Sequence, residues 1–219
     1  MNPSAKRPAP AVSIDDYRRL HQVISAVLRG ANPAADPAQA SVLYAVVGTH
    51  LLRQVHKLEA APVAGAALYR IGPQPQDVLS LGHADHGRIS SSPNAFHCWI
   101  ECDGWVIDLM APLFPEMAAR TGAGTRVPQQ MFQKREDAMA KRPEDLRQAG
   151  DFHLVPDTDL TVELLGRFAQ TPGNIGLVQV CKRWYRRAPQ PIQGQWVLEM
   201  GEGRTVEMRL APLALEGAW

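Results

Sequence analysis

The stretch NAFHCWIECDGWVIDLMAP, residues 94–112, decides the fold expected for this chain. At its centre is Asp103-Gly104, one of the strongest two-residue signals for a β-hairpin, because a type I′ turn needs a positive φ at both positions. With this turn, counting outward along both strands places Ile100 opposite Ile107. The stretch therefore predicts two antiparallel strands in a defined register.

Side chains alternate between the two faces of a strand, and the register sorts those of the hairpin into two sets. One set is apolar in character and is expected to face the core: Phe96, Cys98, Ile100, Cys102, Trp105, Ile107 and Leu109. The other set forms a mixed, polar face: His97, Trp99, Glu101, Val106, Asp108 and Met110. We therefore expect the hairpin to have one core face and one polar face.

His97 and Asp108 share the polar face as diagonal neighbours across the two strands. Diagonal β-carbons lie about 7 Å apart or less, a separation that longer side chains can bridge. Asp108 is therefore placed to accept the Nδ1 proton of His97 and to orient the ring as a general base. A strand His is more often a structural residue, and both interpretations stay open. Cys98 and Cys102 point to the opposite face, where they are interpreted as small buried hydrophobic residues.

Two helices precede this hairpin. Ser13 has the residue type and position of a helix N-cap, and apolar residues recur at helical spacing from there until Gly30. A second start signal is Asp36, a capping residue followed by a proline that a first helical turn tolerates. We expect a long apolar helix over residues 38–56.

The rest of the chain adds strands before the hairpin and helices after it. The predicted elements are strands over residues 61–72 and 76–82, a polar loop over 83–94, a mostly helical and irregular region over 114–150, helices over 159–168 and 174–185 (the second also suits a strand), and a hairpin around Gly201–Gly203. Runs of helices and strands without alternating βαβ units indicate an α+β fold. We expect a central antiparallel sheet packed against the 38–56 helix.

Length and composition limit the classes of protein to consider. The 219 residues suffice for one domain, which we place at residues 13–219 after a disordered tail at 1–12. Lys and Arg number 23 and Asp and Glu number 22, without runs of like charge, so we expect no nucleic-acid or membrane-surface partner.

Membrane insertion and secretion are also not expected. No apolar run approaches the roughly 20 residues of a membrane-spanning helix, and the start, MNPSAKRPAPAVS, has no apolar stretch typical of a signal peptide. Three cysteines do not suggest a disulfide framework. We expect a bacterial-type cytoplasmic protein.

The hairpin resembles a known catalytic unit. A His in one strand (FHCWIE), a turn, and an Asp in the next strand (GWVIDLMAP) are similar to the second half of the papain-like and transglutaminase-like cysteine hydrolase core. More specifically, residues 13–219 resemble an uncharacterised bacterial family, a domain of unknown function with this cysteine-proteinase-like fold. The resemblance implies a papain/transglutaminase-like α+β fold in which the nucleophile begins the long helix upstream.

Ser41 is where this chain departs from that pattern. The families have a Cys at the start of the helix, whereas this sequence reads PAQASVLYAVVG and places Ser41 at the matching position. Free N–H groups and the helix dipole lower the pKa of a thiol there and can stabilise an oxyanion. A hydroxyl is much harder to ionise, so a serine depends on His97 to take its proton during attack.

Two functions therefore remain open. In the first, the chain is a hydrolase or acyltransferase that uses Ser41 as nucleophile, His97 as base and Asp108 as orienter, with Gln39 as an oxyanion donor and Trp99 as a substrate-binding residue. In the second, it is an inactive binding or regulatory module that kept the fold but lost the nucleophilic Cys. Ser41 favours the second function, and the His97–Asp108 pair favours the first. Either function implies a small-molecule or peptide substrate or ligand, no metal and no cofactor; the oligomeric state and the substrate stay unknown.

Overall fold

The computed structural model describes residues 10–85, 88–120, 126–199 and 205–219. Its α-helices are α1 (Ile14–Ala31), α2 (Ser41–Leu51), α3 (Phe114–Arg120), α4 (Thr158–Gln170) and α5 (Asn174–Trp184). Its strands are β1 (Ala60–Arg70), β2 (Val78–Leu81), β3 (His83–Asp85), β4 (Arg88–Ser90), β5 (His97–Cys102), β6 (Trp105–Asp108), β7 (Phe132–Arg135), β8 (Phe152–Pro156), β9 (Gln195–Glu199) and β10 (Thr205–Arg209). The chain thus has the mixed α+β composition that the sequence predicts.

α1 begins where its capping signal lies. The hydroxyl of Ser13 accepts a hydrogen bond from the backbone N–H of Asp16 at 3.1 Å, which satisfies one of the free donors of the first turn. The helix buries Tyr17, Leu20 and Ile24 against the rest of the molecule. Of the tail predicted over residues 1–12, residues 1–9 lie outside the described residues. Val12, at its end, is buried and hydrogen-bonded to the side chain of Gln133.

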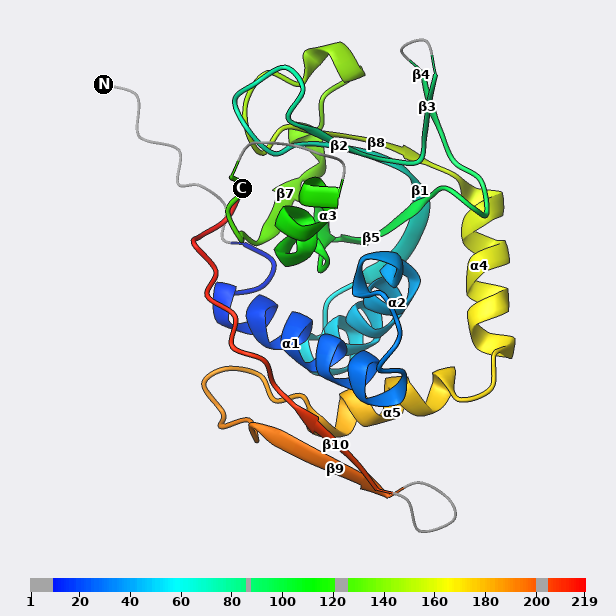
Figure 1. The fold of residues 1–219 in the computed structure, drawn as a ribbon, viewed down its shortest axis with the longest axis vertical. Helices are drawn as coiled ribbons and strands as arrows, with labels where there is room; N and C mark the ends of the chain where they lie inside the picture. The colour runs from blue at the N-terminus through cyan, green and yellow to red at the C-terminus, as the bar shows by residue number, and fades with distance from the viewer. Residues whose placement is uncertain (1–9, 86–87, 121–125, 200–204) are drawn as a thin grey trace.

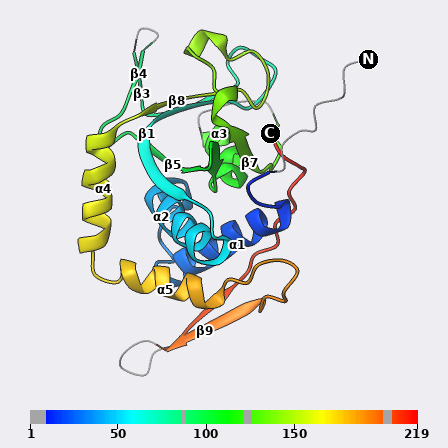
Figure 2. The ribbon, with the colours of Figure 1, turned by 180° about the vertical axis from the view of Figure 1, so that it is seen from behind.

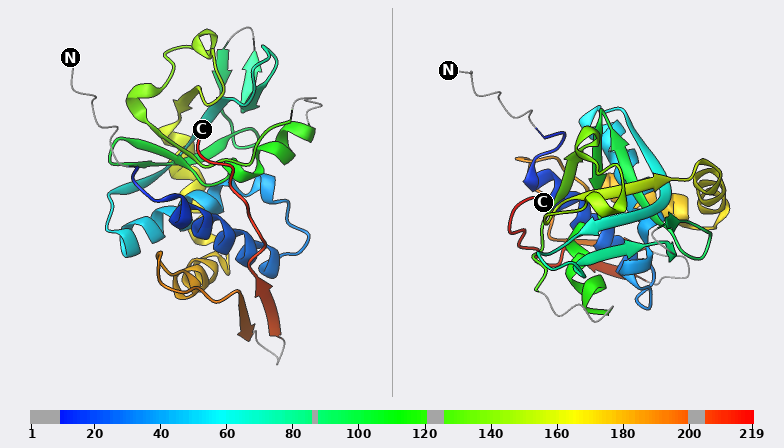
Figure 3. Two further views of the ribbon diagram at one scale, coloured as in Figure 1. Left: turned by 90° about the vertical axis from the view of Figure 1, so that its left-hand side faces the viewer. Right: turned by 90° about the horizontal axis from the view of Figure 1, so that it is seen from above.

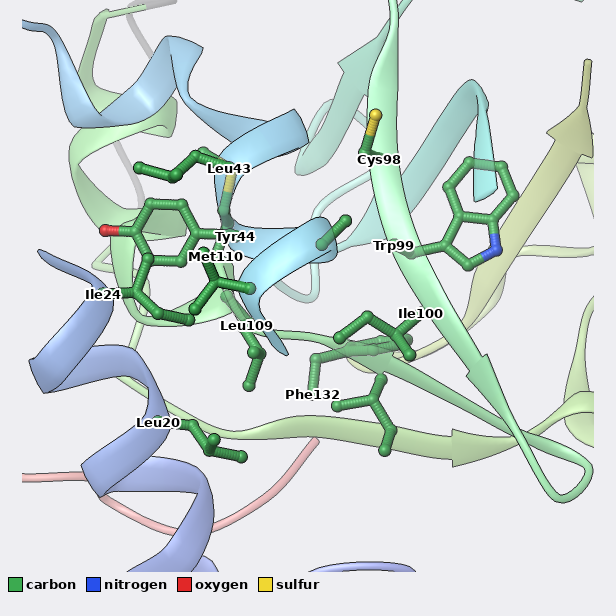
Figure 4. Close-up of a cluster of buried hydrophobic side chains, with 14 of the residues drawn as sticks. Leu20, Ile24, Leu43, Tyr44, Cys98, Trp99, Ile100, Leu109, Met110 and Phe132 are labelled. Atoms are coloured by element: carbon green, nitrogen blue, oxygen red, sulfur yellow. The ribbon is translucent and has the colours of Figure 1, made fainter. Parts of the chain in front are cut away.

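α2 begins three residues later than the sequence pattern predicts. A short 3₁₀ turn, Pro37–Gln39, precedes it, and the regular helix starts at Ser41 and continues as a π-helical turn over Leu52–His56. Gly48 allows the helix to lie against the sheet, because a Cβ there would be 2.6 Å from Cδ1 of Ile100. Tyr44, Leu43 and Ile100 belong to the buried cluster at this contact (Figure 4).

The main sheet is curled and antiparallel, and α2 packs on its concave side (Figures 1 and 2). Its strand order is β2-β1-β5-β6-β7, and β8 pairs with β1. α4 packs against β1, while α1 and α5 lie next to α2 on the side away from the sheet (Figure 1). The hairpin of β9 and β10 lies apart from the sheet, and β10 packs against α1.

Along one edge of β1, the paired strand changes from β5 to β2 near the middle of β1, and the candidate site lies at this change. β1 pairs with β5 over Ala60–Gly65 and with β2 over Ala67–Arg70, while β8 pairs continuously over Gly65–Tyr69. A strand has only two edges, so β5 and β2 must share the edge that β8 does not occupy. The start of β5 and the end of β2 therefore separate beside Ala66.

The hairpin of β5 and β6 has the predicted turn and register. Asp103 and Gly104 both have positive φ, at 50° and 74°, and Ile100 pairs with Ile107. The face predicted to be polar is also covered, because His97 and Asp108 are as buried as the residues of the apolar face. The curled sheet and the elements packed around it cover both faces.

Two further predictions, for residues 83–94 and 114–150, were wrong in part, and the predicted C-terminal hairpin was confirmed. The loop expected over residues 83–94 contains the small hairpin of β3 and β4, which projects from the body of the molecule (Figure 1). β7 extends the sheet within the region 114–150 that was expected to be helical and irregular, and β8 was missed. The C-terminal hairpin forms from β9 and β10, although its turn at Gly201–Gly203 lies outside the described residues.

The segment after β10 returns to the sheet along α1 (Figure 3). Its end pairs with the residue before β7, since Met131 donates to the carbonyl oxygen of Gly217 and Trp219 donates to that of Met131. Over the described ranges, every helix is too short or too polar to span a membrane.

Candidate functional site

The site is centred on His97, the first residue of β5, and Asp108, the last residue of β6. Nε2 of His97 lies 2.6 Å from Oδ2 of Asp108, and the two side chains are 2% and 1% exposed. This is the diagonal pair expected from the hairpin register. Charge-assisted hydrogen bonds are strong, and a dry environment strengthens them further, so the pair holds the imidazole ring in one orientation.

Asp108 is itself held by the surrounding backbone. Its second oxygen, Oδ1, accepts a hydrogen bond from the N–H of Met110 at 2.8 Å. The hydroxyl of Tyr17, from α1, donates to the carbonyl oxygen of Asp108. The carboxylate is therefore held by the backbone that follows it, and the residue is tied to α1, which supports its alignment with His97.

Tyr69 of β1 completes the surroundings of the pair and was missed in the sequence. Its ring meets that of His97 edge-on, with centroids 6.0 Å apart. Burial and the nearby charge of Asp108 raise the pKa of Tyr69 well above its ordinary value, so its hydroxyl stays protonated. Its place in a largely apolar strand carries no sequence signal for this role.

The ring nitrogen that contacts Asp108 differs from the prediction. From the sequence we expect Nδ1 to make this contact, but Nε2 makes it. Among the described residues, none hydrogen-bonds to Nδ1 of His97. A neutral ring that donates from Nε2 to Asp108 therefore has an acceptor lone pair at Nδ1, as a general base requires.

Ser41 lies at the start of α2, as the resemblance implied. The N-cap position is Ala40, which provides no side-chain cap, so the N–H groups of the first turn have no capping partner. The positive end of the helix dipole also lies there and favours developing negative charge. This arrangement can stabilise an oxyanion next to the Ser41 hydroxyl.

Cys98 lies next to Ser41, a contact that face alternation did not predict. Burial raises the pKa of the Cys98 thiol to about 12, and a hydrogen bond with the Ser41 side chain partly opposes this shift. The side chains of Cys98 and Trp99 point to opposite sides of β5 (Figure 4). The thiol is therefore protonated near neutral pH and is a partner of Ser41, in agreement with the interpretation that it is no nucleophile.

A pocket of about 500 Å³, which we call the Ser41 pocket, brings these residues together. Gln39 and Ser41 line it from the start of α2, and His97 lines it from β5. The remaining walls are Ser80–Gly82 at the end of β2, residues 93–96 before β5, and Met117 of α3. The pocket occupies the place where β2 and β5 separate along β1.

Of the five predicted site residues, Trp99 stands apart from the pocket. Its ring is buried against Gly65, and its Nε1–H donates to Glu101 at 3.3 Å. Asp108 lies behind His97 and acts on the pocket through it. The structure thus brings Gln39, Ser41 and His97 to one pocket.

The lining residues define the chemistry that the Ser41 pocket can support. Its walls contain hydroxyl, amide, imidazole and apolar groups, and they lack Asp, Glu, Lys and Arg side chains within the described part of the chain. Across the same residues, no group of three or more His, Cys, Asp or Glu side chains is placed to hold a metal ion. Hydroxyl, imidazole and backbone donors together suit acyl transfer.

Comparisons with known proteins agree with this fold and leave the chemistry open. A family model described as "Protein of unknown function (DUF2026)" matches residues 13–219. The structure is similar to a solved one, described as the crystal structure of genomics APC5867, with a TM-score of 0.84 and 31% sequence identity. The similarity covers 98% of this chain and 100% of that chain. No curated protein matches.

Proposed function

This chain belongs to the DUF2026 family of proteins of unknown function, and from its site we propose that it is an acyl-transfer or amide-hydrolysing enzyme of papain-like or transglutaminase-like fold. The observation that carries the proposal is the buried His97–Asp108 pair, whose unpartnered Nδ1 belongs to a ring that lines the same pocket as Ser41. A pair with a purely structural role has no need of a pocket or of a free ring nitrogen.

The reaction follows from the roles of these side chains. Nδ1 of His97 takes the proton of the Ser41 hydroxyl while Oγ attacks the carbonyl carbon of the substrate. The resulting oxyanion is stabilised by the free N–H groups at the start of α2, and Gln39 adds a side-chain amide donor. His97 then gives the proton to the leaving amine or alcohol as the bond to the carbonyl carbon breaks, and the acyl group remains on Ser41 as an ester.

The second half of the reaction regenerates the enzyme. A water, or an acceptor amine or alcohol, gives its proton to Nδ1 of His97 and attacks the ester carbonyl. The bond to Oγ of Ser41 breaks, His97 returns the proton to that oxygen, and the product acid or transferred acyl group leaves. The carboxylate of Asp108 stabilises the imidazolium that forms in each half.

The walls of the Ser41 pocket indicate the kind of acyl group. An ionic side chain would need a partner charge when it leaves water, and none of the lining residues supplies one. We therefore propose a small-molecule or peptide substrate whose acyl portion is uncharged. The cytoplasmic location expected from the three cysteines remains a prediction.

The test is the intact mass of the protein after exposure to a panel of uncharged phosphonylating and acylating probes. Wild type is compared with Ser41→Ala and His97→Ala, and Ser80→Ala is the matched control because Ser80 lines the same pocket from β2. We expect a mass increase of one probe in wild type and in Ser80→Ala, and none in the other two variants.

A fourth variant, Ser41→Cys, separates the two candidate functions. If wild type is unmodified and Ser41→Cys is labelled only when His97 is present, the chain is a binding module that lost its chemistry with the thiol. If neither is labelled, or if labelling persists in Ser41→Ala, the assignment of Ser41 as nucleophile is wrong.

A further inference from the structure

A second cavity, which we call the α1–α3 pocket, has a volume of about 210 Å³ and lies outside the proposed active site. Gln22 and Arg29 line it from α1, Glu116 from α3 and Gln129 from the segment before β7. The chain after β10 covers it with residues 211–213, where it runs back along α1 (Figure 3). The pocket shares α3 with the Ser41 pocket, because Glu116 lines one and Met117 lines the other.

The floor of the α1–α3 pocket is polar but uncharged. Nδ1 of His21 lies 2.7 Å from the carbonyl oxygen of Leu109 and donates to it. Burial lowers the pKa of His21 to about 4, so the ring is neutral near pH 7. The hydroxyl of Ser25 lies 3.2 Å from Nε2 of His21 and 2.7 Å from the hydroxyl of Tyr44. The ionic character of the pocket therefore comes from its rim.

The rim carries one charge of each sign. Arg29 uses Nε to bond the carbonyl oxygen of Ser25 at 3.3 Å, and none of the described carboxylates forms an ion pair with it. Glu116 pairs through Oε1 with Arg120 at 2.6 Å. Burial raises the pKa of Tyr44 to about 12, and the charges of Arg29 and Glu116 act on the same hydroxyl, lowering and raising this pKa respectively. Arg29 and Glu116 both line the pocket, so the rim offers one cation and one anion.

Two glutamines, Gln22 and Gln129, line the same pocket. Nε2 of Gln22 donates to the carbonyl oxygen of Ala211 at 2.7 Å, and Nε2 of Gln129 donates to that of Pro112 at 3.3 Å. These bonds fix both amides. Among the described residues, nothing donates to either Oε1 atom. Over the part of the chain that the structure describes, the pocket thus combines a guanidinium without an ion-pair partner, a carboxylate, and two glutamine side chains whose amide oxygens accept no hydrogen bond.

We propose that the α1–α3 pocket binds a small zwitterion of the α-amino acid type. Its carboxylate would pair with the guanidinium of Arg29, which has the planar donor geometry that a carboxylate matches. Its ammonium would donate to Glu116 and to the glutamine oxygens. At about 30 Å³ for each water, the volume holds about seven non-hydrogen atoms, the size of a small amino acid. The inference does not depend on any chemistry at Ser41.

The test is a calorimetric titration of the full chain with L-serine, alongside acetate and methylammonium, which each carry only one of the two charges. We expect L-serine to bind and the two fragments to bind at least tenfold more weakly. Arg29→Gln and Glu116→Gln should each weaken L-serine binding about tenfold or more, because each removes a charged hydrogen-bond partner.

Three further variants make the test specific. Arg53→Gln, a change at an exposed arginine of the π-helical turn, and Ser41→Ala should bind L-serine like wild type. Gln129→Leu should weaken binding without removing a charge, so it tests the pocket even if Glu116→Gln loosens α3. Absence of L-serine binding, acetate binding as tight as that of L-serine, or full binding by Arg29→Gln would each overturn the proposal.

Discussion

Replacing Asp108 by Asn tests the central element of the site, because the change is nearly isosteric and alters only what the carboxylate accepts. Oδ1 of Asp108 accepts from the N–H of Met110 at 2.8 Å, and Oδ2 faces Nε2 of His97 at 2.6 Å. In the Asn variant the remaining oxygen keeps the Met110 bond, and the amide NH₂ faces Nε2. The imidazole must then accept at Nε2 and carry its proton on Nδ1, where it no longer acts as a base.

Asp108→Asn and Asp108→Ala should differ in their free energy of unfolding but lose a similar part of the labelling rate of Ser41. Both hydrogen bonds persist in Asp108→Asn, and only the charge assistance of one is lost, so the free energy of unfolding should fall by about 1 kcal/mol. In Asp108→Ala two buried donors, on His97 and Met110, lose their acceptor, which costs about 2–6 kcal/mol. Labelling of Ser41 by a phosphonylating probe should fall about 10³–10⁴-fold in either variant, because the base is in the wrong tautomer or is no longer held.

Three measurements check this reasoning. Urea denaturation gives the free energies of unfolding, intact-mass kinetics give the labelling rate, and ¹⁵N chemical shifts of the imidazole give the tautomer of His97 without any substrate. We expect Nε2–H in wild type and Nδ1–H in Asp108→Asn. A variant that keeps the Nε2–H tautomer, or that is labelled at the wild-type rate, would refute the role given to Asp108.

Further predictions concern stability and can be checked by urea denaturation. Burial lowers the pKa of His21 from 6.5 to about 4, so protonation of this ring opposes folding. The free energy of unfolding should therefore fall by about 3 kcal/mol as the pH falls from about 6.5 to about 4. The variant His21→Gln should lack this part of the pH-dependent loss. Gly65→Ala should cost about 3 kcal/mol, because its Cβ would lie 2.1 Å from the backbone oxygen of Val155. In the control Gly166→Ala the added Cβ has no atom within 4 Å, and the change should stabilise α4 by about 0.5–1 kcal/mol. A lower stability of Gly166→Ala, or an unchanged stability of Gly65→Ala, would contradict the packing argument. Gly104→Ala should cost about 1–2 kcal/mol, because φ at this turn is 74°, and a neutral effect would mean that the turn relaxes.

Local chemistry determined the parts of the structure that the sequence predicted best. The turn at Asp103-Gly104 needs positive φ at both positions, and this alone sets which residues of β5 and β6 face one another. The contact between His97 and Asp108 follows from that register. The start of α1 at Ser13 is equally local, because a capping hydroxyl satisfies an N–H only three residues away.

Elements that depend on distant partners could not be predicted from the local sequence. β7 and β8 have only short apolar stretches, and they become strands because β6 and β1 present unpaired edges to them. The polar face of the hairpin is buried for a similar reason, since Tyr69 covers His97 from β1. The alternation of side chains along a strand predicts which of them share a face. It does not predict which other part of the chain covers that face.

The sequence by itself thus determined the α+β class, the helix that begins with a candidate nucleophile, and the pairing of His97 with Asp108. Tertiary structure decided which nitrogen of His97 faces Asp108, that Ser41 contacts Cys98, and that Trp99 lies outside the pocket. It also decided where both pockets lie, because each is walled by segments that are far apart in the chain. Local rules act over a few residues, whereas a cavity exists only after the sheet has curled and brought its distant walls together.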